Sequence, residues 1–178
     1  LVIDSDYIIA NKNLLNLFNS NKEFAIAKKY KDFFGINGVM ESRVSVSSIP
    51  MYWATVMFFR KCPVAENIFN LATYIRDNWG YHRNLYNIAS VKFRNDYAFS
   101  IAVHTMNGFT EGNAQFDLPY ILYNSFDTDI PIAIDNGNIK ILSNNRDNYS
   151  FHQLKNTSVH IMNKFELDKL IDKELLNE

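Results

Sequence analysis

The chain has 178 residues, of which 47% are hydrophobic, so it is large and apolar enough to bury the core of one domain. Its net charge is −1 and its basic residues are scattered, a pattern that argues against a nucleic-acid-binding surface. The single cysteine, Cys62, excludes a disulfide framework and a cysteine-based zinc site, and it favours a reducing, cytoplasmic location. The longest apolar run, residues 52–59, is far shorter than the roughly 20 residues that a membrane span needs.

Segments rich in apolar, aromatic and β-branched residues predict strands in several parts of the chain. The first of them, residues 1–3, leads directly into Asp4-Ser5-Asp6. Residues 135–138, with the sequence Asp-Asn-Gly-Asn, are typical of the tight turn of a β-hairpin. The other strands are predicted at residues 52–59, 119–123, 131–134, 139–142 and 157–162.

Helices are predicted where apolar residues recur at helical spacing. Pro63 is suited to a first helical turn, because the N–H group that proline lacks would be unpaired there, and Gly80 is expected to end that helix. Asn95 is a plausible N-cap for a later helix, which Gly108 is expected to stop. The helices are predicted at residues 11–18, 23–34, 63–79, 81–88, 94–107 and 165–176, with a break at 35–38 and a serine-rich loop at 42–48. This mixture predicts an α/β fold in a single domain of residues 1–178.

Two carboxylates, Asp4 and Asp6, follow the first predicted strand. Such a pair can share one divalent cation, because Mg²⁺ and Mn²⁺ prefer oxygen ligands, and strand ends in α/β sheets commonly bind ligands. The same spacing recurs at Asp127 and Asp129, so the spacing alone is not specific, and only the first copy directly follows a run of three apolar residues. The alternative interpretation of Asp4 and Asp6 is an exposed strand end with turn-forming acids.

Three further polar residues are candidates for a site or for a structural role. His160 lies in the last predicted strand, where a neutral imidazole can complete an oxygen-rich Mn²⁺ site, although a lone histidine in an apolar strand is commonly a packed, hydrogen-bonded residue. Asp96 begins a predicted helix, where it either belongs to a site or is an acid favoured by the helix dipole. His104, two turns later, is interpreted as structural.

The order of these features resembles that of glycosyltransferases of the GT-A type, including hypothetical ones from marine microbes and their phages. The resemblance covers most of the chain, and its most diagnostic element is the first one. It rests on the apolar strand with Asp4-Ser5-Asp6, residues 52–61, the helix start at 94–96 and residues 159–164. It implies a partial GT-A fold, a mixed sheet flanked by helices, and transfer of a sugar from a nucleotide-diphosphate donor to an acceptor.

The resemblance also implies a role for each candidate residue. Asp4 and Asp6 match the DxD motif, which holds Mn²⁺ or Mg²⁺ together with the diphosphate of the donor. His160 matches a late histidine that is the third metal ligand. Asp96 falls where the family often places an acid near the donor sugar, and Lys164 corresponds to a lysine that contacts phosphate.

The sequence departs from the family pattern in two places. Trp53-Ala54-Thr55 stands where members commonly carry Asn-Ser-Gly or Asn-Ala-Gly under the donor sugar. In addition, GT-A domains begin with a nucleotide-binding segment before the DxD strand, and this sequence does not contain such a segment. The resemblance therefore implies an N-terminally truncated chain, the metal-binding and acceptor-binding part of the domain, with its own activity in question. We expect the sheet edge or apolar face left by such a truncation to favour self-association into a homo-oligomer.

Two other functions fit parts of the pattern. An apolar strand leading into Asp-x-Asp is also typical of haloacid-dehalogenase-like phosphatases, in which the first aspartate is the nucleophile. Against this, Tyr7 stands where those enzymes usually have threonine or valine, and no late Gly-Asp-x-x-x-Asp pair occurs. The non-enzymatic alternative is an inert fragment or a binding module, which the missing nucleotide-binding segment favours.

Overall fold

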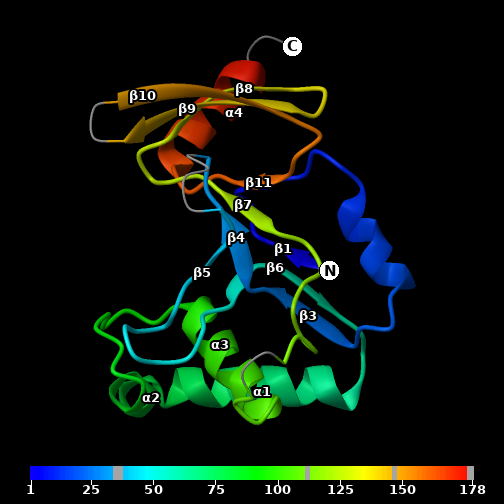
Figure 1. Cartoon of the computed structure of the whole chain (residues 1–178), viewed down its shortest axis with the longest axis vertical. Helices are drawn as coiled ribbons and strands as arrows, with labels where there is room; N and C mark the ends of the chain where they lie inside the picture. Colours follow the sequence, from blue (N-terminus) through cyan, green and yellow to red (C-terminus); the bar gives the residue numbers. More distant parts are fainter. Residues whose placement is uncertain (34–37, 111–112, 146–147, 176–178) are drawn as a thin grey trace. The chain divides into compact units, whose positions relative to one another are not determined.

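The computed structural model describes residues 1–33, 38–110, 113–145 and 148–175, and its fold is mixed α/β (Figure 1). The chain divides into two compact units, and the single domain expected from the sequence stays a prediction. Unit 1 contains Leu1–Ile3, Asn19–Lys29 and Met40–Ile121, and unit 2 contains Asp4–Phe18, Tyr30–Val39 and Leu122–Glu178. Within the described ranges, no helix has the length and apolarity needed to cross a membrane.

Unit 1 is built on an antiparallel sheet in the order β1-β6-β3. The central strand β6 (Trp53–Phe59) is buried along almost its whole length and pairs with β1 (Val2–Ile3) and β3 (Phe24–Ala27). Helix α3 (Asn95–Met106) packs against β6 and against α1 (Pro63–Asp77). Aromatic contacts among Phe24, Phe69, Phe99 and Phe116 fill the space between them. The unit also contains the short strand β5 (Met40–Glu41) and the helix α2 (Trp79–Leu85).

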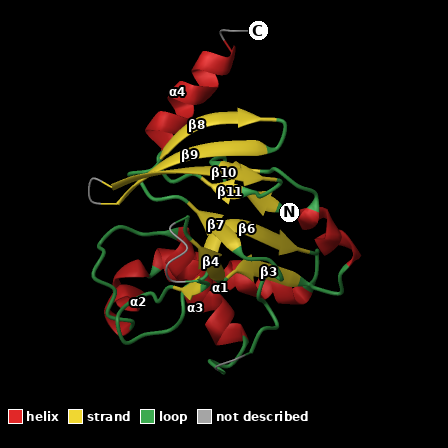
Figure 2. Ribbon diagram, turned by 45° about the horizontal axis from the view of Figure 1, so that its top comes forward, coloured by secondary structure: helices red, strands yellow, loops and turns green. Residues whose placement is uncertain are grey.

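Unit 2 contains a small mixed sheet and a three-stranded meander (Figure 2). In the mixed sheet, β11 (Val159–His160) lies between β2 (Tyr7–Ile8), which is antiparallel to it, and β7 (Leu122–Asn124), which is parallel. Strand β4 (Lys29–Lys31) pairs with β7. The meander is formed by β8 (Ile130–Asp135), β9 (Asn138–Asn145) and β10 (Asn148–Lys155).

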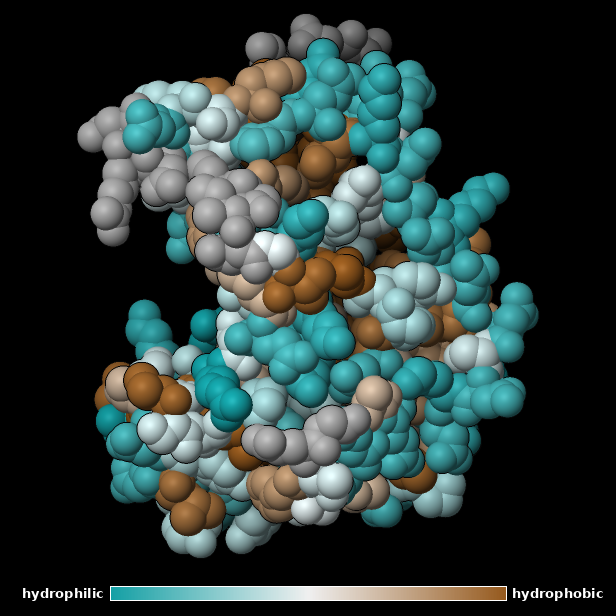
Figure 3. Space-filling model, viewed as in Figure 1, coloured by the Kyte–Doolittle hydropathy of each residue, from teal (hydrophilic) through white to brown (hydrophobic). Residues whose placement is uncertain are grey.

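Two helical segments complete unit 2. The 3₁₀ helix η1 spans Asn13–Asn19, and the closing helix α4 (Lys164–Leu175) packs against β8. The core gathers apolar side chains from the meander, the mixed sheet and α4, namely Ile139, Ile141, Val159, Ile161 and Leu167. On the face shown in Figure 3, hydrophilic residues dominate and hydrophobic areas lie between them.

The helix predicted at residues 23–34 is wrong, because this segment forms β3 and β4. Ala25, Ile26 and Ala27 are fully buried, so the short apolar run has no solvent-facing side of the kind that an amphipathic surface helix needs. Backbone hydrogen bonds of Ile26 with Phe116 and Leu118 fix the segment in extended form, and this tertiary pairing overrides local helix propensity. Most of the break predicted at 35–38 lies outside the described residues.

Two predicted helix boundaries are also wrong. Gly80 does not end a helix but lies inside α2, and α1 ends at Asp77, where the Asn78 side chain donates a hydrogen bond to the Tyr74 carbonyl oxygen. Asn95 is not the N-cap of α3, because Arg94 occupies that position in an extended conformation and provides no side-chain cap.

Strand β10 was not predicted from the sequence. It pairs with β9 over its whole length, yet its first four residues are all exposed, so only its second half shows the alternation of burial that marks a strand. The other predicted elements are confirmed with shifted ends; the segment at 11–18 is the 3₁₀ helix η1, and residue 176 lies outside the described part of the last helix.

The hairpin turn between β8 and β9 gives a test of this fold. Asn136 and Gly137 have φ angles of 45° and 76°, as the primed turn of a two-residue hairpin requires. A Cβ atom at position 137 would lie 3.3 Å from both the Ala10 carbonyl oxygen and the Asn156 Oδ1 atom. We therefore expect Gly137→Ala to lower the free energy of unfolding by about 1–2 kcal/mol, measured by urea denaturation.

Gly80→Ala is the matched control for this substitution. A Cβ atom there meets nothing within 4 Å, and Gly80 lies in a helix, so alanine should raise the free energy of unfolding by about 0.5–1 kcal/mol. Equal effects of the two substitutions would contradict the turn and the helix described here.

Candidate metal centre

A tight turn places the two N-terminal carboxylates at the entrance to β2. The Tyr7 amide donates a hydrogen bond to the Asp4 carbonyl oxygen at 3.1 Å, which closes the turn. Tyr7 then begins β2 and lies opposite His160 in β11. The Ile161 amide donates to the Asp6 carbonyl oxygen at 2.9 Å. The backbone therefore fastens Asp6 to the strand that carries His160.

The side chains of Asp4, Asp6 and His160 converge within unit 2. Each offers one ligand atom, and the three atoms lie within 4.8 Å of one another. Asp6 Oδ1 lies 3.3 Å from His160 Nε2. Adjacent ligands of an octahedral ion with bonds of about 2.1 Å lie about 3.0 Å apart, so this spacing suits two neighbouring ligands of Mg²⁺ or Mn²⁺. Asp4 is exposed, which leaves its carboxylate room to adjust.

The buried carboxylate of Asp6 is incompletely satisfied. Asp6 is 3% exposed, and its Oδ1 atom has no hydrogen-bond partner among the residues that the structure describes. The nearby Nε2 atom of His160 makes no hydrogen bond to this oxygen. A buried acceptor without a partner is costly, so the arrangement favours a cation at this oxygen.

Asn124 fixes the imidazole that faces Asp6. The Nδ1 atom of His160 lies 3.2 Å from Asn124 Oδ1, and an amide oxygen only accepts hydrogen bonds. This contact places a proton on Nδ1, so the other ring nitrogen, Nε2, is the one that lies on the side of Asp6 and offers a lone pair when the ring is neutral. In a neutral ring, that lone pair and the carboxylate oxygen repel each other unless a cation binds both. Such a second hydrogen bond is the usual way in which a metal-binding histidine is oriented.

Lys164, the first residue of α4, supplies a positive charge on the other oxygen of Asp6. Its Nζ atom lies 3.0 Å from Asp6 Oδ2, while the lysine side chain is 69% exposed. The hydrogen bond and the negative charge of Asp6 raise the pKa of Lys164, so the ammonium stays charged at neutral pH. Asn163 holds the start of the helix, because its side-chain oxygen accepts a hydrogen bond from the Glu166 amide.

The second Asp-x-Asp copy has a structural role. Asp129 is fully buried, and its carboxylate accepts hydrogen bonds from the amides of Phe126 at 2.7 Å and Asn144 at 3.3 Å. Burial raises the pKa of Asp129, while these two hydrogen bonds act in the opposite direction. Asp127 is exposed. The same spacing in sequence thus closes a loop here, with the oxygens of Asp129 occupied by backbone donors.

Asp96 belongs to unit 1 and is not a member of the Asp4–Asp6–His160 cluster. One oxygen of Asp96 accepts a hydrogen bond from the Ala54 amide at 2.9 Å, and the other accepts one from Arg94 Nε at 3.1 Å. These contacts tie the start of α3 to β6. A role for Asp96 near a donor sugar stays a prediction.

Sequence reasoning missed two residues that position His160. Asn124 orients the imidazole ring of His160. The Ser125 amide donates a hydrogen bond to the His160 carbonyl oxygen, and the Ser125 hydroxyl oxygen accepts one from the Met162 amide. These two bonds hold the strand that carries His160. The one signal available was a pair of polar residues directly after the strand predicted at 119–123.

No family model matches the sequence, and no curated protein and no solved structure gave a significant match.

The cluster predicts specific binding of Mn²⁺. At a Mn²⁺ concentration about 100-fold above Kd, binding should add about 2.7 kcal/mol to the stability of the folded chain. Asp6→Asn should remove this gain in a thermal-shift titration, because it removes the charge on the buried ligand oxygen. Asp127→Asn makes the same chemical change at the exposed position of the structural copy and should retain the gain. The site is wrong if Mn²⁺ stabilises both variants equally.

Proposed function

We propose that this chain is the metal-binding part of a GT-A-type glycosyltransferase, which transfers a sugar from a nucleotide-diphosphate donor to an acceptor. The observation that carries the proposal is the Oδ1 atom of Asp6, which is buried, lacks a hydrogen-bond partner among the described residues and lies 3.3 Å from His160 Nε2. The reaction itself comes from the sequence resemblance, which includes Asp4, Asp6 and His160 as its metal ligands.

The donor set is suited to a hard or borderline divalent cation. Two carboxylates and one imidazole supply oxygen and nitrogen ligands, and an octahedral ion would keep further positions for phosphate oxygens. A bound Mn²⁺ or Mg²⁺ would neutralise the charge that develops as the nucleoside diphosphate leaves. Asn124 would keep the His160 ring in its ligand orientation throughout.

Lys164 supports a phosphate-containing ligand over a purely structural ion. Its ammonium neutralises Asp6 Oδ2, but the side chain is largely exposed and is anchored to the site at its tip. A divalent cation on Asp6 would replace that neutralisation and repel the ammonium. Lys164 would then be available to donate a hydrogen bond to a phosphate oxygen at the same site.

The mixed α/β fold is consistent with the proposal at the level of fold class. The mixed sheet of unit 2 brings the first and last motifs of the resemblance together, because β2 follows Asp6 and β11 carries His160. The GT-A assignment, the partial domain and the acceptor remain parts of the proposal.

Binding of a nucleoside diphosphate tests the role of Lys164. We expect UDP or GDP to bind in the presence of Mn²⁺ and not after EDTA treatment, as measured by isothermal titration calorimetry. Lys164→Met should weaken this binding about tenfold, while leaving Mn²⁺ binding intact or stronger, because it removes one charge-assisted hydrogen bond and one competing cation. Lys169→Met changes another lysine of the same helix, which pairs with Glu166, and should have no effect.

Two outcomes would contradict the proposal. Nucleotide binding that is unaffected by EDTA would separate the diphosphate from the metal cluster. Hydrolysis of a generic aryl phosphate that depends on Asp4 would favour the phosphatase alternative, in which that residue is the nucleophile.

A further inference from the structure

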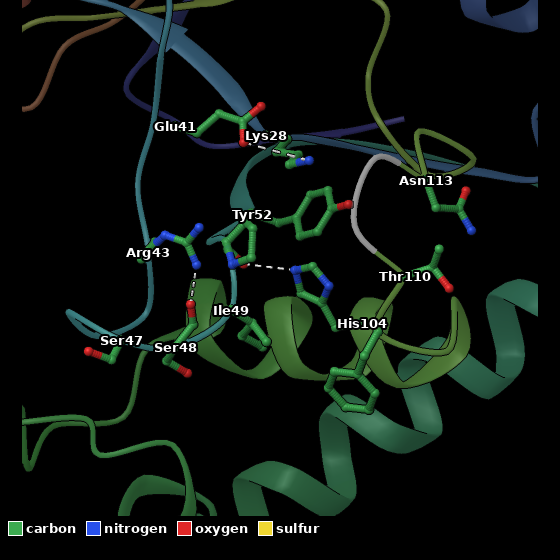
Figure 4. Close-up of a pocket in the computed structure, with 12 residues that line it drawn as sticks. Lys28, Glu41, Arg43, Ser47, Ser48, Ile49, Tyr52, His104, Thr110 and Asn113 are labelled. Atoms are coloured by element: carbon green, nitrogen blue, oxygen red, sulfur yellow. Dashed lines mark hydrogen bonds and ion pairs between the residues drawn. The ribbon is translucent and has the colours of Figure 1, made fainter.

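A pocket of about 660 Å³ opens within unit 1, and none of the metal-cluster residues lines it (Figure 4). Its volume lies in the range of about 300–1,000 Å³ that is usual for small-molecule sites. Lys28 and Glu41 lie on one side of it, Arg43 on another, and His104 reaches it from α3. Its lining is rich in side chains with hydrogen-bonding groups, which is unlike the predominantly apolar lining of many such sites.

The charges around the pocket are balanced. Lys28 Nζ lies 3.7 Å from Glu41 Oε2 and 4.0 Å from Asp117 Oδ2, distances that give attraction without a hydrogen bond. Asp117 does not line the pocket, but it lies beside two lining residues, Lys28 and Tyr52, so that with Arg43 the local charges are two cations and two carboxylates. A balanced site has no net attraction for an anion, so it favours a neutral ligand. The Lys28 side chain is only 12% exposed, so its ammonium donors are held in place at the pocket.

The pocket also presents fixed hydrogen-bond acceptors. His104 Nε2 lies 2.9 Å from the Pro50 carbonyl oxygen, which only accepts, so Nε2 carries the proton and Nδ1 is an acceptor. Burial lowers the pKa of His104, which keeps the ring neutral. The Tyr52 hydroxyl donates to Asp117 Oδ1 at 2.9 Å, so its oxygen is left to accept, and burial raises the pKa of Tyr52. Both donors and acceptors therefore line a space of ligand size.

An aromatic wall completes the lining. The ring of Phe109 stacks on the ring of His104, with the two ring centroids 6.3 Å apart. The ring centroids of His104 and Tyr52 are 5.4 Å apart. Phe109 is 48% exposed and has a φ of 57°, a left-handed conformation that residues other than glycine rarely adopt. Hydrogen bonds from its amide to the His104 carbonyl oxygen and to Asn107 Oδ1 hold it there. This conformation ends helix α3 and fixes the position of the exposed ring at the pocket.

We propose that this pocket binds a neutral carbohydrate. A pyranose ring has a rim of hydroxyls that both donate and accept hydrogen bonds, which matches Lys28, Arg43, Glu41 and His104. It also has a face of C–H groups that packs on an aromatic ring such as Phe109. The inference goes beyond the proposed function, because binding here needs neither a metal ion nor a nucleotide.

Saturation-transfer NMR on the metal-free chain tests this inference. The probes are the methyl glycosides of glucose, galactose, mannose and N-acetylglucosamine at millimolar concentration, with glucuronate and inorganic phosphate as anionic probes. We expect at least one neutral glycoside to bind, with the strongest saturation on the C–H protons of one ring face. Phe109→Ala should weaken that binding about tenfold. Tyr81→Ala truncates another exposed aromatic residue of unit 1, outside the pocket, and should leave it unchanged.

Arg43→Met is a second variant, because Arg43 is exposed at the pocket and its loss does not open the core. It should also weaken glycoside binding. The inference is overturned if no neutral glycoside binds, if only the anionic probes bind, or if both pocket variants bind as wild type does. Asp6→Asn should not affect glycoside binding, and the pocket variants should not affect the Mn²⁺ response, so failure at one site is distinguishable from failure at the other.

Discussion

The hydrogen bond from the Ile161 amide to the Asp6 carbonyl oxygen, at 2.9 Å, is the contact on which the candidate centre depends. Together with the pairing of Tyr7 and His160, it joins residues from the two ends of the chain. Without it, a buried carboxylate and a buried imidazole would not be held at ligand spacing. The backbone therefore determines the geometry of the site, and the side chains determine its chemistry.

The two Asp-x-Asp copies show how environment separates a candidate metal ligand from a structural residue. The oxygens of Asp129 are occupied by the amides of Phe126 and Asn144, so no cation is needed there. Asp6 has Lys164 on one oxygen and no hydrogen-bond donor among the described residues on the other. A buried charge that is only half compensated is unfavourable for stability, and the proposed metal ion would remove that deficit.

The sequence predicted the parts of the fold in which local pattern and tertiary structure agree. The apolar strand β6 and the amphipathic helix α1 were found because their burial follows a clear apolar pattern. The failures came where contacts distant in sequence dominate. Residues 24–27, part of the helix predicted at 23–34, are buried within unit 1, and β10 is mostly exposed and stabilised by its pairing with β9.

The candidate site was predicted residue by residue, but not its arrangement. Asp4, Asp6 and His160 were named from the motif and the resemblance, and the structure brings them together. Asn124 and Ser125 were missed because their roles depend on the parallel pairing of β7 with β11, which no local pattern reveals. The contacts of Asp96 with Ala54 and Arg94 likewise arise from the packing of α3 against β6.

The most direct test of the metal centre is pulsed electron paramagnetic resonance on the Mn²⁺-loaded chain. Electron spin echo modulation from a directly bound ¹⁴N nucleus should be present in the wild type and absent in His160→Gln. Asn124→Ala should weaken or broaden it, because the imidazole then loses the hydrogen bond that orients it. A spectrum of hydrated Mn²⁺ without nitrogen coupling, or nitrogen coupling that survives in His160→Gln, would contradict the account.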